Sequence, residues 1–331
     1  MDKAPLVSII IPNFNHSRFL RERLESVFNQ TFEDFEVILL DDASTDSSVE
    51  ILEEYAKDPR VSHLVVNKKN SGSPFRQWQR GIELSQGKYI WIAESDDSCD
   101  PDFLLTCVAM MKNNPKAVIA FGGSITIDEN SSKIEIDNDR WYDKRFKKRQ
   151  GECRVFDGIR YITHNLIWIN YIYNASGTLF RRDAYGDGSE FESCMRMRNA
   201  GDWLFWSIMA TKGDVIEIYR KLNHFRFHSG STTREGVNKG KSNGNLFDED
   251  FIVLRHIFEN TRIPTLRKMI RLGALMKKIQ RAQMSEEDRK AAYLKGKELL
   301  KYNKKDYLTE RISKTLSNFI PGISTIRNDR L

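Results

Sequence analysis

Short apolar runs alternate with helical patterns through the first 125 residues of this chain. Nearly all-apolar runs of this length are typical of strands that are covered on both faces, as in a parallel sheet. Between the runs, apolar residues recur at helical spacing, as at Phe19, Leu20, Leu24 and Val27. The alternation predicts an α/β layered domain with a largely parallel sheet flanked by helices. The predicted strands are 7–11, 35–40, 61–66, 89–93 and 117–121.

Length and composition describe a globular protein. The chain has 331 residues, of which 40% are hydrophobic and 30% charged, enough for one large domain or two modest ones. No stretch approaches the ~20 uninterrupted apolar residues of a membrane span. The first residues lead into a strand without a signal-peptide pattern. The four cysteines lack metal-ligand spacing, so we expect reduced thiols and a cytoplasmic location.

Charge is distributed unevenly along the chain. From residue 261 onward there are 18 Lys or Arg against 7 Asp or Glu, a net charge of +11, while the whole chain carries +6. A nucleic-acid arm, a solvated helical face and a patch on anionic lipid head groups are all compatible with such a basic tail. We expect no nucleic-acid partner. The functional interpretation of the basic tail is a peripheral contact with the inner face of the membrane.

An acidic cluster follows the predicted strand 89–93. Residues 94–97 read Glu-Ser-Asp-Asp, and like charges this close require a cation, protons or basic partners. Carboxylates suit Mg²⁺ or Mn²⁺, whereas the alternative is a solvated turn before a helix that starts near Asp100. Ligands of parallel sheets bind beyond the carboxyl ends of the strands. Asn13 and Asp41 also end predicted strands, which favours the ligand site.

Several short motifs follow one another along the chain: Ser8-Ile9-Ile10-Ile11-Pro12-Asn13-Phe14-Asn15, Leu40-Asp41-Asp42-Ala43-Ser44-Thr45-Asp46, Asn70-Ser71-Gly72, Gly81-Ile82 with Gly87-Lys88-Tyr89-Ile90, and Ala93-Glu94-Ser95-Asp96-Asp97. In this order and spacing they resemble the family 2 glycosyltransferases, which are inverting enzymes with the GT-A fold. The resemblance covers residues 1–125 and, more loosely, the chain to about residue 233. It implies a GT-A type, Rossmann-like sheet for the catalytic domain.

The resemblance also implies the donor-site residues. Asp97 corresponds to the direct cation ligand, and Asp96 to a partner of ribose or of a metal-bound water. Glu94 replaces an Asp that is common in the family, so its role stays open. Residues 76–79 read Arg-Gln-Trp-Gln where relatives commonly carry Ala-Arg-Asn, which weakens the transfer of a phosphate contact to Arg76. Nucleotide binding is assigned to Pro12, Asn13, Phe14, Asn15, Asp41, Asn70, Arg76 and Asp96.

Two segments of the second half complete the resemblance. Residues 201–206 are similar to the family's helix start over the acceptor site, which makes Asp202 the general base; the alternative is a helix cap. Residues 225–231 are similar to the segment that lies near the diphosphate of the donor in the family. There His228 is a third metal ligand, a phosphate contact or a structural residue of an aromatic strand.

These observations predict an inverting glycosyltransferase. We expect it to move a sugar from a UDP-linked donor to a hydroxyl of a glycan or lipid-linked acceptor in cell-envelope polysaccharide synthesis, with Mn²⁺ or Mg²⁺ as cofactor. The alternatives are a nucleotidyltransferase or sugar-nucleotide synthase, whose Gly-rich phosphate loop is missing after the first strand, and a silent nucleotide- or glycan-binding scaffold. The predicted regions are a nucleotide-sugar half (1–125), an acceptor half (126–233), a linker (234–246) and a basic helical region (247–331).

Overall fold

The computed structural model describes residues 4–135, 149–172, 174–228, 230 and 247–316. Contacts divide the chain into two compact units that interleave along the sequence. Their borders differ from the predicted ones, because segments near residues 160 and 205 group with the C-terminal helices; the predicted linker 234–246 lies outside the described residues. Unit 1 comprises Met1–Asp157, Ile172–Arg198 and Lys212–His228, and unit 2 comprises Gly158–Tyr171, Asn199–Thr211 and Ser229–Leu331.

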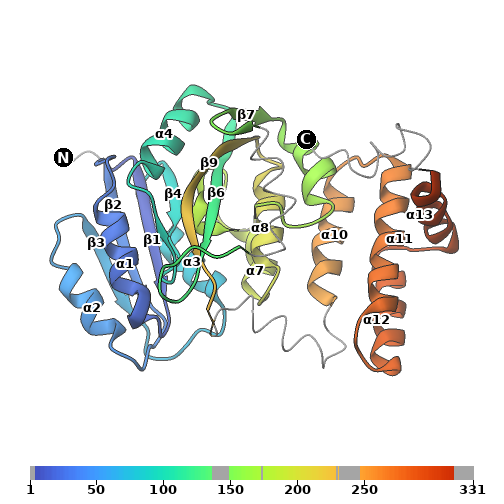
Figure 1. Cartoon of the computed structure of the whole chain (residues 1–331), viewed down its shortest axis with the longest axis horizontal. Coiled ribbons are helices and arrows are strands. Elements are labelled where there is room, and N and C mark those ends of the chain that lie inside the picture. Colours follow the sequence, from blue (N-terminus) through green and yellow to red (C-terminus); the bar gives the residue numbers. More distant parts are fainter. Residues whose placement is uncertain (1–3, 136–148, 173, 229, 231–246, 317–331) are drawn as a thin grey trace. The chain divides into compact units, whose positions relative to one another are not determined.

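The first half of unit 1 is a parallel sheet, visible in Figure 1. Its strands are β1 (Val7–Asn13), β2 (Phe35–Asp41), β3 (Val61–Val66) and β4 (Tyr89–Ile92). They lie in the order β3-β2-β1-β4, and every neighbouring pair is parallel. All residues of β1, β2 and β4 are buried, as their apolar sequences predict.

Helices cover both faces of this sheet. Apolar residues of α1 (Ser17–Phe28), α2 (Ser48–Tyr55) and α4 (Phe103–Asn113) join one core with the alternate residues of β1 that begin at Val7. The opposite face receives α3 (Pro74–Leu84), where a Cβ on Gly81 would lie 2.3 Å from Ile10 Cγ2. Gly81 therefore sets how closely α3 approaches the sheet.

The second half of the sheet mixes strand directions. Among the described residues the sheet has nine strands, and β4 continues through β8, β6 and β9 to β5 at the edge, while β7 pairs with β9. Only β6 and β9 are parallel there; β8, β5 and β7 run antiparallel to their neighbours. The bounds are β5 (Ser98–Cys99), β6 (Ala117–Ile127), β7 (Cys153–Phe156), β8 (Thr178–Arg181) and β9 (Asp214–Arg226), with short helices at Ala175–Gly177, Ser189–Phe191 and α7 (Glu192–Met195).

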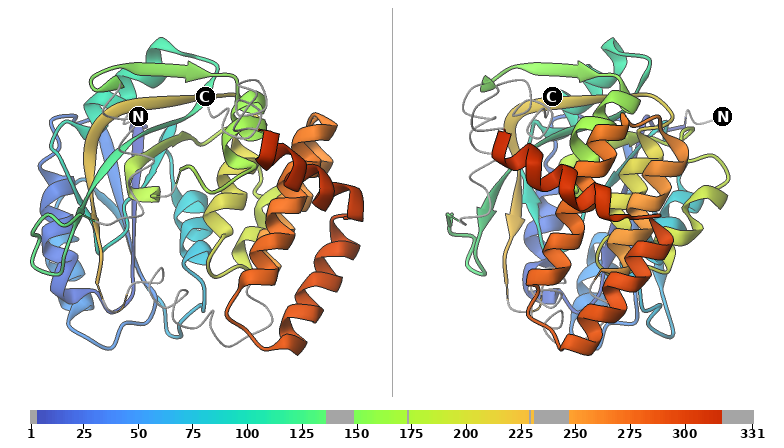
Figure 2. Two further views of the ribbon diagram at one scale, coloured as in Figure 1. Left: turned by 45° about the vertical axis from the view of Figure 1, so that its right-hand side comes forward. Right: turned by 90° about the vertical axis from the view of Figure 1, so that its right-hand side faces the viewer.

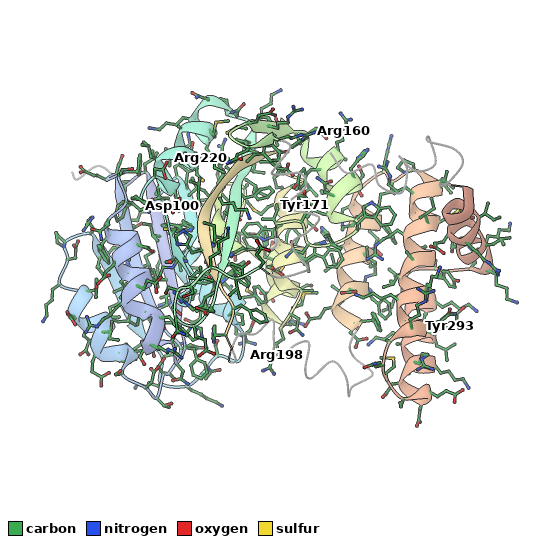
Figure 3. All side chains as sticks on the ribbon, viewed as in Figure 1. Asp100, Arg160, Tyr171, Arg198, Arg220 and Tyr293 are labelled. Atoms are coloured by element: carbon green, nitrogen blue, oxygen red, sulfur yellow. The ribbon has the colours of Figure 1, made fainter. Side chains whose placement is uncertain are left out.

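Unit 2 is helical, as its sequence pattern predicts. Helix α11 packs against both α12 and α13, and α10 packs against α12 and α8, as can be followed in Figure 2. Tyr293 of α12, labelled in Figure 3, lies with its ring centroid 5.9 Å from that of Tyr302. The bounds are α6 (Gly158–Tyr161), a π-helix (Ile162–Leu166), α8 (Gly201–Met209), α10 (Asp248–Asn260), α11 (Thr265–Arg281), α12 (Glu286–Leu299) and α13 (Lys304–Leu316).

The predicted α/β domain and the helical C-terminal region are both confirmed. The prediction of parallel strands is correct for β1 to β4. The antiparallel strands belong mainly to the second half of the sheet, where the sequence pattern is mixed. Within the described part of the chain, no helix combines the length and apolar character needed to cross a membrane.

Candidate functional site

The carboxyl ends of β1 and β2 form one side of the candidate site. Asn13 and Asp41 are register partners, and Asn13 Nδ2 donates to Asp41 Oδ2 at 2.9 Å. The second carboxylate oxygen, Asp41 Oδ1, accepts from the backbone N–H of Ser44 at 2.8 Å. Asn13 Oδ1 is buried and has no hydrogen-bond partner among the described residues. A buried acceptor without a partner is one that a ligand N–H or hydroxyl can satisfy.

The residues next to Asn13, at positions 12, 14 and 15, differ in exposure and in hydrogen bonding. Phe14 is 44% exposed and presents an aromatic face, while Pro12 is buried. Asn15 adopts a left-handed conformation with φ of 57°, and its side-chain Oδ1 accepts from the N–H of Thr45 at 2.8 Å. Its own N–H donates to Ser44 Oγ at 2.9 Å. Asn15 thus joins the loops after β1 and β2.

Asp42 organises the loop that leads into α3. Its carboxylate accepts from Asn67 Nδ2, Gln77 Nε2 and the N–H and hydroxyl of Ser71, at 2.7 to 3.1 Å. Asn70 Nδ2 donates to the Asp42 carbonyl at 3.0 Å, so the predicted nucleotide ligand Asn70 has a structural contact here. Arg76 is exposed on α3.

Two imidazoles and one carboxylate converge beyond β4. Ligand atoms of His16, Asp96 and His228 all lie within 4.8 Å of one another, and His228 Nε2 lies 3.1 Å from Asp96 Oδ2. His16 immediately precedes α1, Asp96 follows β4, and His228 follows β9. We call these three residues the His–Asp–His cluster. His16 had not been singled out from the sequence, although its place after the Asn13–Asn15 loop at a strand's carboxyl end is a usable signal.

The charges of the three residues in the cluster act on one another. Burial opposes ionisation of Asp96, but the hydrogen bond from His228 and the charges of the two imidazoles outweigh it and lower the pKa of Asp96. Burial lowers the pKa of His16, against the opposing effect of the Asp96 charge. A neutral imidazole and an ionised carboxylate are the forms that bind metals, so these donors fit a divalent cation.

Asp97 faces the interior. It is 2% exposed, its Oδ1 accepts from the backbone N–H of Arg226 at 2.8 Å, and its Oδ2 lies 4.0 Å from Arg23 Nη2. Burial, and then the charge of Asp96, raise the pKa of Asp97 to about 7. The structure therefore groups Asp96, and not Asp97, with the imidazoles.

Glu94 and Trp78, the two departures from the family pattern, contact each other. Trp78 Nε1 donates to Glu94 Oε1 at 2.7 Å, and the Glu94 backbone N–H donates to Ser176 Oγ at 3.1 Å. Burial and the nearby Asp96 charge raise the pKa of Glu94 to about 8. The indole of α3 thus orients the first carboxylate of the acidic motif.

Arg226 contacts the backbone of the acidic motif, residues 94–97. Its side chain is fully buried, Nε donates to the Asp96 carbonyl at 2.7 Å, and Nη2 pairs with Glu22 at 2.6 Å. These contacts hold the motif's backbone.

Asp202 belongs to unit 2, on the first turn of α8. Its Oδ2 accepts from Asn170 Nδ2 at 2.7 Å and its Oδ1 from the N–H of Trp203 at 2.7 Å. Glu249 of α10 accepts the N–H groups of Asn199 and Ala200 at 2.9 and 2.6 Å, so a second carboxylate holds the backbone that leads into α8. Burial raises the pKa of Asp202 to about 7, since its hydrogen bonds offset only part of the desolvation.

Comparisons with known proteins agree with this architecture. Residues 8–187, more than half of the chain, match the family model described as glycosyl transferase family 2. Chondroitin synthase of Escherichia coli is 34% identical over 135 residues, which are 40% of this chain and 19% of that protein. The poly(ribitol-phosphate) beta-glucosyltransferase of Bacillus spizizenii is 37% identical over 110 residues, 33% of this chain and 17% of that protein. The chain therefore spans about a fifth of the length of these relatives.

A solved structure shares the fold. The crystal structure of S. aureus TarS 1–349 in complex with UDP-GlcNAc has a TM-score of 0.66 at 14% identity, covering 98% of this chain and 88% of that one. The family model matches across β1 and β2, which carry Asn13 and Asp41, and across the turn after β4 that carries Asp96, so the chain belongs to glycosyltransferase family 2 and has the GT-A fold.

Proposed function

We propose that this protein is an inverting, cation-assisted glycosyltransferase that uses a UDP-linked sugar and extends a cell-envelope glycan. The observation that carries the proposal is the His–Asp–His cluster at the same sheet edge as the Asn13–Asp41 pair. The UDP-GlcNAc complex of the TarS fold relative supports a nucleotide-sugar donor. The relatives' names support a polymeric glycan acceptor.

The nucleotide end of the donor is proposed to bind at β1 and β2. Asn13 Oδ1 supplies an acceptor, Asp41 accepts from base or ribose groups, and Phe14 stacks on the base. Pro12 shapes this loop. The contacts of Asn15 and Asn70 support an indirect role, because each holds the neighbouring loops in position.

The diphosphate end is proposed to lie beside the His–Asp–His cluster. Asp96 and His228 are the proposed cation ligands, in preference to Asp97, whose carboxylate bonds to Arg226. A bound Mn²⁺ or Mg²⁺ offsets the negative charge that grows on the leaving diphosphate. Arg76, exposed on α3, remains a proposed phosphate contact.

Asp202 is the proposed general base. The acceptor oxygen attacks the anomeric carbon opposite the diphosphate, the bond to the diphosphate oxygen breaks, and Asp202 takes the hydroxyl proton. With a pKa raised to about 7, its carboxylate is a stronger base than an exposed aspartate yet still ionised in much of the population at neutral pH.

The experiment is sugar transfer measured beside donor binding. UDP-GlcNAc and other UDP-sugars are offered with Mn²⁺ to the wild type, Asp202→Asn and Asp96→Asn. The proposal expects wild-type turnover, unchanged donor affinity but lost transfer in Asp202→Asn, and weakened donor binding in Asp96→Asn. Absence of UDP binding by the folded wild type contradicts it.

The basic helices are proposed to rest on an anionic membrane that carries the acceptor. Leu266, Leu294, Leu308 and Ile312 of unit 2 are 44 to 55% exposed among Lys and Arg residues, a pairing that suits the lipid interface. Sedimentation with phosphatidylglycerol vesicles tests this, and equal binding to phosphatidylcholine vesicles contradicts the electrostatic part.

A further inference from the structure

His16 occupies a position that its neighbours hold firmly. Asn15 turns the chain with its left-handed φ of 57°, and its side chain and N–H are bonded to Thr45 and Ser44. Helix α1 begins directly after His16, whose carbonyl accepts from the N–H groups of Phe19 and Leu20, both at 2.9 Å. The backbone of His16 is therefore fixed on both sides.

Its ring is oriented as well. His16 Nδ1 lies 2.9 Å from Ser95 Oγ, and the ring stands edge-on to His228 with centroids 5.4 Å apart. Since Ser95 engages Nδ1, Nε2 is left as the nitrogen that can coordinate. A polar partner on the second ring nitrogen is the usual way in which proteins fix the tautomer of a metal-ligating histidine.

We propose that His16 is a third protein ligand of the catalytic cation and that it gives this site a preference for Mn²⁺ over Mg²⁺. The inference rests on the proposed function, in which Asp96 and His228 hold the cation, and adds one donor to that site. Without His16 the protein supplies one nitrogen and one oxygen. With it, two imidazole nitrogens face one carboxylate.

The chemistry of the donors sets the direction of this preference. Imidazole binds transition ions, whereas Mg²⁺ favours oxygen ligands and retains its water. A second imidazole therefore stabilises bound Mn²⁺ much more than bound Mg²⁺.

Direct metal titration tests the assignment without relying on turnover. Free Mn²⁺ is followed by electron paramagnetic resonance as the 331-residue protein is added, without nucleotide, and Mg²⁺ is added as competitor. We compare the wild type with His16→Asn, which can retain the Ser95 hydrogen bond but lacks Nε2, and with His16→Ala. His63→Asn is the matched control, because His63 lies on β3 and contacts Ser62 instead of the cluster.

Both His16 variants are expected to bind Mn²⁺ roughly tenfold or more weakly, with Mg²⁺ affinity changed by no more than about twofold and the control unchanged. Mn²⁺ affinity equal to wild type in both variants overturns the proposal, as does a parallel loss of Mg²⁺. UDP binding by the wild type, measured by calorimetry with Mn²⁺ present, distinguishes failure of the proposed function from failure of the His16 assignment. Its absence defeats the proposed function, whereas the nucleotide-free Mn²⁺ titration reports on His16 alone.

Discussion

Replacing Asp202 by asparagine is expected to stabilise the protein at alkaline pH while it removes transfer. In the folded protein the pKa of Asp202 is raised from 3.8 to about 7 by burial, so the folded state holds this proton more tightly than the unfolded chain. The contribution of Asp202 to the free energy of unfolding is fully present when the pH is below its pKa in the unfolded chain. It is lost as the pH rises from about 4 to about 7. Above that window the ionised carboxylate costs a constant amount.

The magnitude follows from the shift. A pKa difference of about three between the folded and unfolded states, at 1.36 kcal/mol per pKa unit, gives an upper limit of about 4 kcal/mol for the cost of ionising Asp202 in the folded protein. Partial exposure of the side chain reduces this cost to about 2–4 kcal/mol. Asparagine carries no charge and therefore avoids the cost. Asn170 Nδ2 now faces position 202, and rotation of the Asn170 amide would present its Oδ1, which is buried without a partner in the described part of the chain, to the new amide donor. The stability advantage of the variant should grow by about 2–3 kcal/mol between pH 5 and pH 8.

Urea unfolding at several pH values measures this difference. Asp187→Asn is the control, because Asp187 lies in a turn where hydrogen bonds from Ser189 lower its pKa, and asparagine there should bring no alkaline gain. Transfer by Asp202→Asn should fall by about 10²- to 10⁴-fold in kcat, and wild-type kcat should rise through pH about 7. A stability difference that is the same at pH 5 and pH 8, or transfer that survives the substitution, refutes the reasoning.

Three further substitutions test separate contacts. Glu249→Ala removes the acceptor for two backbone N–H groups before α8 and should cost about 1–2 kcal/mol and lower kcat, whereas Glu249→Gln, which keeps an acceptor, should retain most of both; urea unfolding and transfer assays distinguish them. Trp78→Phe removes the 2.7 Å hydrogen bond to Glu94 in a buried position and should raise the donor KM several-fold, with a loss of stability of about 1–3 kcal/mol; an unchanged KM means that the pair has no role in donor binding. Gly87→Ala places a Cβ 2.5 Å from the Ser8 backbone nitrogen and should destabilise unit 1 by about 1–3 kcal/mol, which an unaltered unfolding midpoint would contradict.

Local pattern was enough to predict most helices and strands of the first 125 residues, and the end of the sheet at which the donor is proposed to bind. Strand and helix periodicities depend on neighbouring residues, so 7–11, 35–40 and 89–93 read correctly from the sequence. Because parallel strands share a carboxyl edge, Asn13 and Asp41 were expected together, and they are register partners.

Partner choice among the site residues required the tertiary structure. Asp96 and Asp97 are adjacent and chemically alike, and what distinguishes them is β9, which arrives more than a hundred residues later and brings the Arg226 N–H to Asp97 and His228 to Asp96. The Trp78–Glu94 bond likewise joins two elements that no local pattern relates.

The sequence by itself determined that this chain forms an α/β sheet with acids and amides at one edge, because burial and periodicity act over a few residues. Only the tertiary structure decided which carboxylate meets the imidazoles and that His16 joins them. Metal ligation and hydrogen bonding act over about 2–3 Å. The approach of the ligand atoms of residues 16, 96 and 228 to within 4.8 Å of one another is set by the packing of α1, β4 and β9, which the order of the residues does not specify.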